Sequence, residues 1–246
     1  MTRIVLHRFP ISHFSEKGRA LLDFKGLEYD IREYTLGLPQ RKIKRLSGQR
    51  QVPVIEHAGK VVSDSTAIAH YLDEAFPDKR RLIPEDEPRR SEVLALEDRI
   101  DRTLGLGAPA VWFDDMVKNG DREQLDLLAI EVHGLPRIGA HLFGKGFGLA
   151  RAFGLGNGFF EKSRNKTRAL LKELSQRLEK TEYLVGNEPT LADVAAVGIT
   201  LHLEWPHSRR LSSMIPAGRG VASFVDDPEL ARFFEFRRTF YQRYLS

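Results

Sequence analysis

The stretch "FPISHFSEKGRALLDFKG" (residues 9–26) decides how this chain begins to fold. It follows "RIVLH" (residues 3–7), a short run rich in β-branched side chains that predicts a strand. Residues 15–26 carry apolar side chains at helical spacing and end in glycine, which predicts a helix with a glycine cap. The chain therefore begins with a strand that leads into a helix, and two serines, Ser12 and Ser15, lie where that helix begins.

The same alternation of strands and helices continues to about residue 80. Runs with a strand pattern alternate with runs at helical spacing, so the predicted order is β-α-β-α-β-β-α. This order predicts a small mixed sheet with helices packed on it, in which a right-handed crossover joins one parallel pair of strands. The remaining predicted elements are a strand at 28–35, a short basic helix or loop at 39–47, strands at 52–56 and 61–63, and a helix at 65–76.

The tripeptide Val52-Pro53-Val54 is unusual within this pattern. Proline cannot donate a hydrogen bond to a sheet, so a proline that opens a central strand needs an explanation. The sequence allows a cis peptide bond at a tight turn, or an ordinary trans proline at the first residue of the strand.

Residues 77–90, "PDKRRLIPEDEPRR", contain three prolines and many charges, which is typical of a linker. The sequence beyond them has helical spacing and essentially no strand pattern. We therefore expect an α/β domain at 1–80, a linker at 81–90 and an all-α domain at 91–246. The predicted helices of the second domain lie at 91–105, 165–180, 190–205 and 228–245. The sequence "TLAD" at 190–193 has the form of a capping box.

The composition restricts the class of protein. Of 246 residues, 41% are hydrophobic, which supports a buried core, and no apolar run approaches the ~18 residues that cross a bilayer. The first ten residues lack the pattern of a secretory signal, and the chain has no cysteine, so we expect a cytoplasmic protein without disulfides or a cysteine nucleophile. The eight histidines show no metal-ligand spacing, so we expect no bound metal. The sequence also lacks the Gly-x-Ser-x-Gly motif, which disfavours an acyl hydrolase.

The positive charge of the chain is concentrated in its first third. Residues 1–80 hold 14 Lys and Arg against 10 Asp and Glu, whereas the rest holds 24 of each. A basic first domain would attract a small anion or nucleic acid, unless it is simply a solvated surface. No basic stripe interleaved with aromatic residues is present, so we expect no nucleic-acid partner.

Residues 134–160 contain eight glycines among apolar and basic residues. The runs "GKGFG" and "GLGNG" resemble phosphate-binding loops only superficially, because no strand precedes them and neither ends in Lys-Ser or Lys-Thr. A pair of helices with glycines at close contacts is the preferred interpretation. The alternative is a basic amphipathic segment that lies on a membrane surface.

Ser12 has two interpretations. A hydroxyl just before a helix can cap the unpaired backbone N–H groups of the first turn. In the same position, a hydroxyl can donate a hydrogen bond to a ligand thiolate, which the positive end of the helix dipole also stabilises. A free thiol has a pKa of ~8.5, and such surroundings lower it.

The chain resembles the cytosolic glutathione transferase family. Four stretches carry the resemblance: "FPISHFSEK" at the helix entry, "QVPVIE" (51–56), "SDSTAIAHYL" (63–72) and "NEPTLADVAA" (187–196). The resemblance covers residues 1–80 and about 160–205, and nothing comparable covers 105–160. It implies a thioredoxin-like N-terminal domain followed by an all-helical domain.

The resemblance also implies a role for several residues. Ser12-His13-Phe14-Ser15 occupies the place where thioredoxin-like proteins have Cys-x-x-Cys, so Ser12 would activate glutathione and the chain could not exchange disulfides with residues of its own. Ser15 would pack or cap inside the helix. Glutathione would be bound by the backbone of Val52 before a cis Pro53, by Asp64 and Ser65 at its γ-glutamyl end, and by Gln51 and Lys42 at its glycyl carboxylate.

The resemblance further implies a glutathione co-substrate, no tightly bound cofactor, a hydrophobic electrophile or peroxide as second substrate, and a homodimer. Phe9, His13, Trp112 and Phe113, together with Trp205, are candidates for the electrophile pocket, although aromatic residues on helices more often belong to the core. Two alternatives remain open. One is a binding module of the same fold without turnover, and the other is a membrane-associated isomerase similar to prostaglandin E synthase, which relies on a cysteine that this chain lacks.

Overall fold

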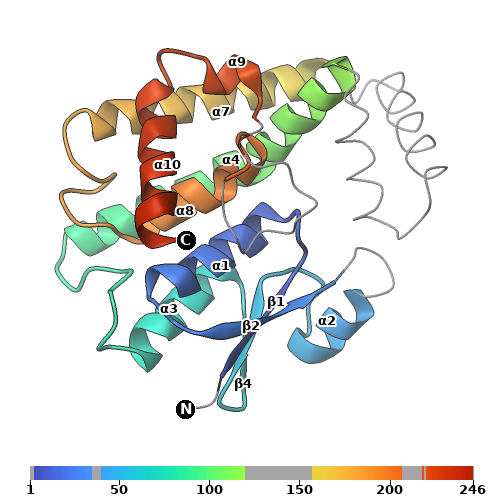
Figure 1. Cartoon of the computed structure of the whole chain (residues 1–246), viewed down its shortest axis with the longest axis vertical. Coiled ribbons are helices and arrows are strands. Elements are labelled where there is room, and N and C mark those ends of the chain that lie inside the picture. The colour runs from blue at the N-terminus through green and yellow to red at the C-terminus, as the bar shows by residue number, and fades with distance from the viewer. Residues whose placement is uncertain (1–2, 35–39, 120–156, 207–217, 219, 246) are drawn as a thin grey trace.

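The structure is a computed structural model that describes residues 3–34, 40–119, 157–206, 218 and 220–245 (Figure 1). The N-terminal elements are β1 (Ile4–Arg8), α1 (His13–Phe24), β2 (Tyr29–Glu33), α2 (Gln40–Ser47), β3 (Val54–His57), β4 (Lys60–Ser63) and α3 (Ser65–Ala75). The C-terminal elements are α4 (Arg89–Asn119), α7 (Asn157–Leu178), α8 (Leu191–Ile199), the 3-10 helix η1 (Thr200–His202), α9 (Ala222–Val225) and α10 (Ala231–Tyr244).

The N-terminal half has the predicted order β-α-β-α-β-β-α. Within the described residues, its four strands form one mixed sheet in the order β2-β1-β3-β4. β1 is parallel to β2 and antiparallel to β3, and β3 and β4 form an antiparallel hairpin. The parallel pair needs the crossover that α1 supplies, as the alternation in the sequence predicts.

The two faces of the sheet carry different helices because strand side chains alternate between faces. Ile4, Leu6 and Ile55 belong to the main core, together with residues of α1 and α3. Val54 lies on the opposite face, in a smaller cluster with Phe9, Ile43 of α2 and Val52. The N-terminal half therefore has three layers, with the sheet between α1 and α3 on one face and α2 on the other.

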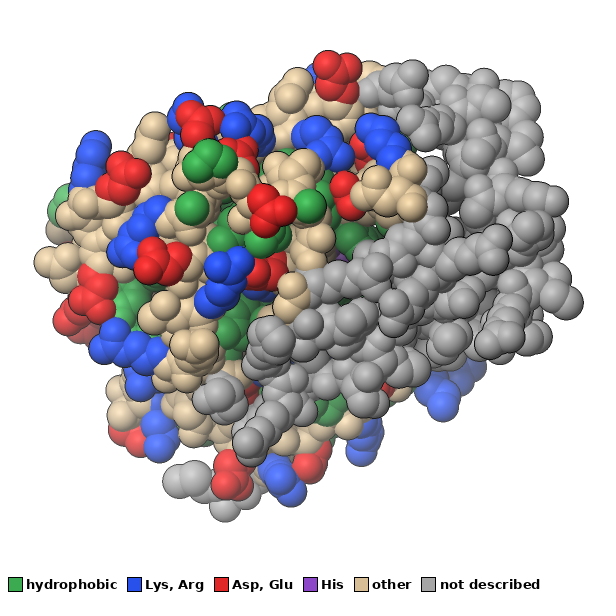
Figure 2. All heavy atoms as spheres, turned by 45° about the horizontal axis from the view of Figure 1, so that its top comes forward, with side chains coloured by type: hydrophobic (Ala, Val, Ile, Leu, Met, Phe, Trp, Pro, Cys, Tyr) green, Lys and Arg blue, Asp and Glu red, His purple; other side chains and the backbone are tan. Residues whose placement is uncertain are grey.

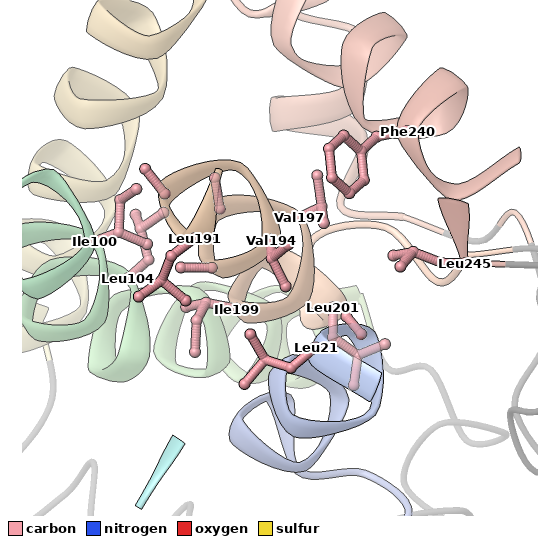
Figure 3. Packing of buried hydrophobic residues seen from close by; sticks show 14 of the residues in the cluster. Leu21, Ile100, Leu104, Leu191, Val194, Val197, Ile199, Leu201, Phe240 and Leu245 are labelled. Carbon is pink, nitrogen blue, oxygen red and sulfur yellow. The ribbon is translucent and has the colours of Figure 1, made fainter. Parts of the chain in front are cut away.

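α8 lies at the centre of the molecule, and all of its residues from Leu191 to Ile199 are buried. Figure 3 shows its side chains between those of α4, α1 and α10; these include Ile100, Leu104, Leu21 and Phe240. A helix that is apolar all round needs protein on every side, and here both halves of the chain provide it.

Three predicted helices have clearly different ends in the structure. The helix predicted at 165–180 is α7, which begins earlier, at Asn157, so that Phe160 stacks on Phe113 of α4. α4 continues to Asn119 beyond the prediction of residue 105, although it contains Gly105, Gly107 and Pro109, which are poor helix formers. Packing compensates: a Cβ atom at Gly107 would lie 2.2 Å from Thr167 Oγ1 of α7, so the glycine allows the two helices to approach closely.

The predicted helix 190–205 is shorter in the structure. α8 ends at Ile199 and tightens into η1, where the Thr200 hydroxyl donates to the Ala196 carbonyl at 2.7 Å. Pro206 then follows and disfavours helix in the residue before it. The capping box is confirmed, since the Asp193 carboxylate accepts a hydrogen bond from the Thr190 N–H at 2.8 Å.

The glycine-rich segment 134–160 lies outside the described residues, except for its last four, which belong to α7. Among the helices that the structure describes, none is long and apolar enough to span a membrane.

Candidate functional site

Ser12 is the N-cap of α1. Its backbone is extended, with φ −80° and ψ 118°, and its Oγ accepts a hydrogen bond from the Ser15 N–H at 3.2 Å. The side chain is half-buried, and no described group accepts a hydrogen bond from its hydroxyl proton. The oxygen therefore caps the helix while the proton is free to be donated to a ligand.

Ser15 is buried one turn into the same helix. Its Oγ accepts a hydrogen bond from the Phe9 N–H at 3.2 Å, which agrees with a packing role. The Ser12 N–H in turn donates to the Phe9 carbonyl at 3.0 Å. These bonds fix the tight turn between β1 and α1, and thereby the direction in which the helix N-terminus points.

The Val52–Pro53 peptide bond is cis, so the first of the two interpretations is confirmed. The ring of Pro53 lies against α1 at Gly18, where a Cβ atom would be 2.7 Å from Pro53 Cβ and 2.8 Å from Pro53 Cγ. Only glycine allows this approach of helix to turn. β3 begins after the proline, at Val54, which leaves the backbone of Val52 outside the described sheet pairing.

Strand register brings the separate parts of the site together. Val54 pairs with His7 on one side and with Ser63 on the other. Pro53 therefore lies at the same end of the sheet as the residues that follow β1, where Ser12 is, and as Asp64, which follows Ser63.

Asp64 is the N-cap of α3, and its carboxylate accepts hydrogen bonds from the Thr66 and Ala67 N–H groups at 2.9 and 3.0 Å. Its φ is +80°, a conformation that few residues other than glycine adopt and that often occurs at functional sites. The side chain is exposed, whereas the adjacent Ser65 is buried.

A buried ion cluster lies behind this end of α3. Lys17 Nζ of α1 donates to Glu97 Oε1 at 2.5 Å and to Asp101 Oδ2 at 2.6 Å, both on α4, and Thr66 Oγ1 donates to the same Glu97 oxygen at 2.6 Å. Burial raises the pKa of Asp101 to about 6, with Lys17 opposing the shift and Glu97 adding to it. The cluster links α1, α3 and α4 and adds negative charge near Asp64.

The helical half contributes a wall of rings next to the N-terminus of α1. The His13 ring lies 5.2 Å from that of His202 in η1, and His202 stacks on Trp112 of α4 at 4.9 Å and lies 5.4 Å from Trp205. Within the described chain, neither ring nitrogen of His13 has a hydrogen-bond partner. Burial lowers the pKa of His13 to about 4 and that of His202 well below its usual range, so both rings are neutral at pH 7.

The structure separates the other predicted pocket residues. Phe9 belongs to the small cluster on the α2 face of the sheet, and Phe113 stacks on Phe160 of α7 at 6.4 Å. Among the described contacts, neither ring lies against those of His13, His202 or Trp205. Gln51 is exposed next to Val52, and Lys42 is exposed on α2.

Sequence reasoning did not identify Gly18, His202 or the Lys17 cluster as parts of this region. A glycine inside a helix was the only available signal for Gly18. No sequence signal marks His202 or the ion cluster, because these residues come together only when the two halves of the chain pack. The described residues hold no group of three or more side chains suited to a metal ion.

Comparisons with known proteins agree with this geometry. A family model described as the N-terminal domain of glutathione S-transferases matches residues 6–80, and a model of their C-terminal domain matches residues 159–217. Together they cover more than half of the chain.

Among curated relatives, the chain is 28% identical over 147 residues to glutathione S-transferase U22 of Arabidopsis thaliana, a match of 57% of this chain and 67% of that protein. It is 40% identical over 82 residues to probable glutathione S-transferase GSTU1 of Oryza sativa subsp. japonica, a match of 33% of this chain and 36% of that protein. The chain thus spans between about a third and two thirds of the length of these relatives.

Solved structures agree on the fold. Rice GST1 in complex with glutathione has a TM-score of 0.66 at 22% identity, covering 98% of this chain and 88% of that one. The β-etherase LigF from Sphingobium sp. strain SYK-6 has a TM-score of 0.58 at 24% identity, covering 94% and 98%. With its two family domains and the cis-proline turn beside a serine-capped helix, the chain belongs to the glutathione transferase superfamily.

Proposed function

We propose that this protein is a glutathione transferase that ionises the thiol of glutathione and directs it at a hydrophobic electrophile or a peroxide. The observation that carries the proposal is the arrangement at one end of the sheet. There, Ser12 follows β1, the cis Val52–Pro53 turn leads into β3 and Asp64 follows β4, and because these strands are neighbours we expect one extended thiol peptide to reach all three.

Each part of the site suits a different part of glutathione. The backbone of Val52, which lies outside the described sheet pairing, can bond to the cysteinyl backbone of the ligand. The Asp64 carboxylate can pair with the γ-glutamyl ammonium, and the Ser65 hydroxyl and N–H can donate to the adjacent carboxylate, since the next two N–H groups of the turn already donate to Asp64. Gln51 and Lys42 are the candidates for the glycyl carboxylate, since both are exposed near this turn.

The chemistry follows from the start of α1. A thiolate placed there would accept the free hydroxyl proton of Ser12 in a hydrogen bond and would lie at the positive end of the helix dipole. Both effects lower the pKa of the thiol, and each pKa unit corresponds to ~1.4 kcal/mol. His13 at the start of α1 is connected through the His202 ring to Trp112 of the helical half, and the electrophile would bind beside these rings.

Three broader features complete the proposal. Residues 1–80 would form the thiol-binding domain and residues 91–246 the helical domain, with 81–90 between them. The protein would act in the cytoplasm, and it would form a homodimer.

Thermal unfolding with glutathione tests the assignment. A ligand that binds only the native state raises the unfolding free energy by RT ln(1 + [L]/Kd), so about 10 mM glutathione should raise the melting temperature measurably. Cysteinylglycine, which lacks the γ-glutamyl group, is the control and should have a much smaller effect. A shift with another thiol and none with glutathione would contradict the choice of co-substrate and leave the fold assignment intact.

Asp64→Asn sharpens this test, because asparagine keeps the helix cap and removes only the charge. Loss of a charge-assisted contact typically costs ~1.5–3 kcal/mol, so calorimetric titration should find glutathione bound roughly ten to a hundred times more weakly. The affinity for cysteinylglycine should hardly change. Equal glutathione affinities of wild type and variant would limit Asp64 to its capping role.

A further inference from the structure

The helix α2 carries a dense cluster of positive charge. Arg41, Lys42, Lys44 and Arg45 lie on the helix and Arg50 follows it, and all five side chains are exposed. No acidic residue occurs between Glu33 and Glu56. In the part of the chain that the structure describes, none of the five forms an ion pair.

Over the rest of the described chain, many cations are paired with acidic side chains. On the face shown in Figure 2, blue and red side chains are intermixed over the helical half. Typical pairs are Arg99 with Glu173 at 2.5 Å and Arg177 with Glu92 at 2.8 Å. The charge cluster on α2 therefore differs from the general surface of the protein.

This cluster suits the helix that carries it only in part, since Lys44 and Arg45 lie in the last turn, where the helix dipole favours cations. Arg41 has like charges three and four residues further along, at Lys44 and Arg45, and such pairs cost an isolated helix ~0.2–0.5 kcal/mol each. The first turn contains no acidic residue, so Arg41 and Lys42 also face the positive end of the helix dipole. The dipole of α2 gives a reason for Lys44 and Arg45 but none for Arg41 and Lys42.

The helix is attached directly to the candidate thiol site. Its one fully buried side chain, Ile43, packs in the small cluster with Val52, the residue before the cis proline, and with Phe9, whose carbonyl accepts from the Ser12 N–H. The apolar face of α2 is thus used against the site, and its charged face points outward. The described helix has no exposed aromatic residue to stack on bases and no exposed apolar residue to enter a bilayer.

We propose that α2 is a steering surface that accelerates the arrival of anionic thiols at the site. This inference rests on the proposed function. Glutathione at pH 7 has two carboxylates and one ammonium, so it carries net negative charge. A local field of one sign raises the association rate of an oppositely charged ligand and loses this effect as salt increases. The preferred thiol is therefore one with net negative charge, and the preference lies in the association rate.

The test uses stopped-flow mixing of the full chain with glutathione, followed by the ultraviolet absorbance of the bound thiolate. The variant R41Q/K44Q/R45Q removes three steering charges and leaves Lys42, a proposed contact of the glycyl carboxylate, in place. At low ionic strength the association rate should fall about threefold to tenfold, and at ~0.5 M salt it should equal that of wild type. The dissociation rate should not change, whereas loss of a direct contact would raise it.

The matched control is K162Q/K166Q/K180Q, which removes three exposed cations on and just after α7 in the helical half. It should leave the association rate unchanged. The monoethyl ester of glutathione, which has no net charge, should bind wild type at a rate that is independent of salt.

The outcomes separate the two proposals. If wild type gives no thiolate signal with glutathione, the proposed function fails. If wild type binds but the α2 variant associates at the wild-type rate at low salt, or the α7 control slows equally, the steering role is overturned. Misfolding is excluded by thermal melting, in which the α2 variant should be about as stable as wild type, because removal of like-charge neighbours offsets the loss of two cations from the last turn.

Discussion

At the scale of single residues, Ser12 combines two functions in one hydroxyl. Its oxygen accepts the Ser15 N–H, and its proton has no described acceptor. Capping and thiolate binding are therefore compatible, and removal of the hydroxyl should affect both stability and chemistry.

Ser12→Ala and Ser15→Ala distinguish these effects. Loss of the cap at Ser12 should lower the unfolding free energy by about 1 kcal/mol. At Ser15, loss of the acceptor for the buried Phe9 N–H should cost about 1–3 kcal/mol. Only Ser12→Ala should raise the pKa of bound glutathione, measured by thiolate absorbance against pH, with urea unfolding as the stability measurement. A raised thiol pKa in Ser15→Ala alone would reverse the two assignments.

His13 makes stability depend on pH. Its pKa is about 4 in the folded chain and near 6.5 when unfolded, so between these values the unfolded chain binds a proton that the folded chain does not. The unfolding free energy should therefore decrease as pH falls through this window, by up to ~1.4 kcal/mol per pH unit from this group.

His13→Phe should remove that contribution while keeping a ring against His202. Asp101 and Asp193, whose pKa values are raised to about 6, act in the opposite direction but are present in both proteins. Urea unfolding from pH 4 to 8 should therefore give a difference between variant and wild type that grows toward low pH. Parallel curves would mean that the imidazole titrates as in the unfolded chain.

At the scale of elements, the contact of α1 with the cis-proline turn determines the geometry of the site. Gly18→Ala would place a methyl group less than 3 Å from Pro53. Alanine favours helix by ~1 kcal/mol over glycine, but forced overpacking typically costs 1–3 kcal/mol, so we expect a net loss of stability and weaker glutathione binding.

Gly158→Ala is the control for that variant, since no atom lies within 4 Å of a Cβ at this position in α7. It should keep wild-type stability and affinity. If Gly18→Ala behaves like this control in urea unfolding and calorimetric titration, the helix and the turn are not as closely coupled as the structure indicates.

At the scale of the whole molecule, the two halves share buried polar contacts. Lys17 of α1 reaches α4, and the Tyr241 hydroxyl of α10 donates to Glu16 of α1 at 2.8 Å. α1 also approaches α8 so closely that a Cβ at Gly198 would lie 2.7 Å from the Lys17 Cα. Because separating the halves would strand buried charges, they should unfold as one unit.

This cooperativity can be measured with two probes. Both tryptophans, Trp112 and Trp205, are in the helical half, so their fluorescence reports on that half, whereas far-ultraviolet circular dichroism reports on both. In urea the two transitions should coincide for wild type. Gly198→Ala should lower the urea midpoint of both transitions. The added methyl group would lie against the backbone of Lys17, which can move away only if the whole helix α1 moves. Transitions that are separate in wild type would contradict the shared unit.

The sequence by itself determined the order of elements in the first half, the capping box at Thr190–Asp193 and the family, because these depend on local patterns within a few residues of each other. It also identified Ser12, Pro53 and Asp64 as candidates. That they lie together follows from strand register, which the motifs alone do not specify.

Only the tertiary structure decided the rest. Local propensity predicts that α4 ends near Gly105, but packing against α7 extends it to Asn119. Local propensity also predicts that α8 continues to Trp205, but the helix ends at Ile199 and becomes a 3-10 helix where the Thr200 hydroxyl bonds to the Ala196 carbonyl. His202 joins His13 because two halves distant in sequence bury their rings against each other. Such contacts arise from burial of surfaces that have no common sequence pattern, so they exist only once the chain has folded.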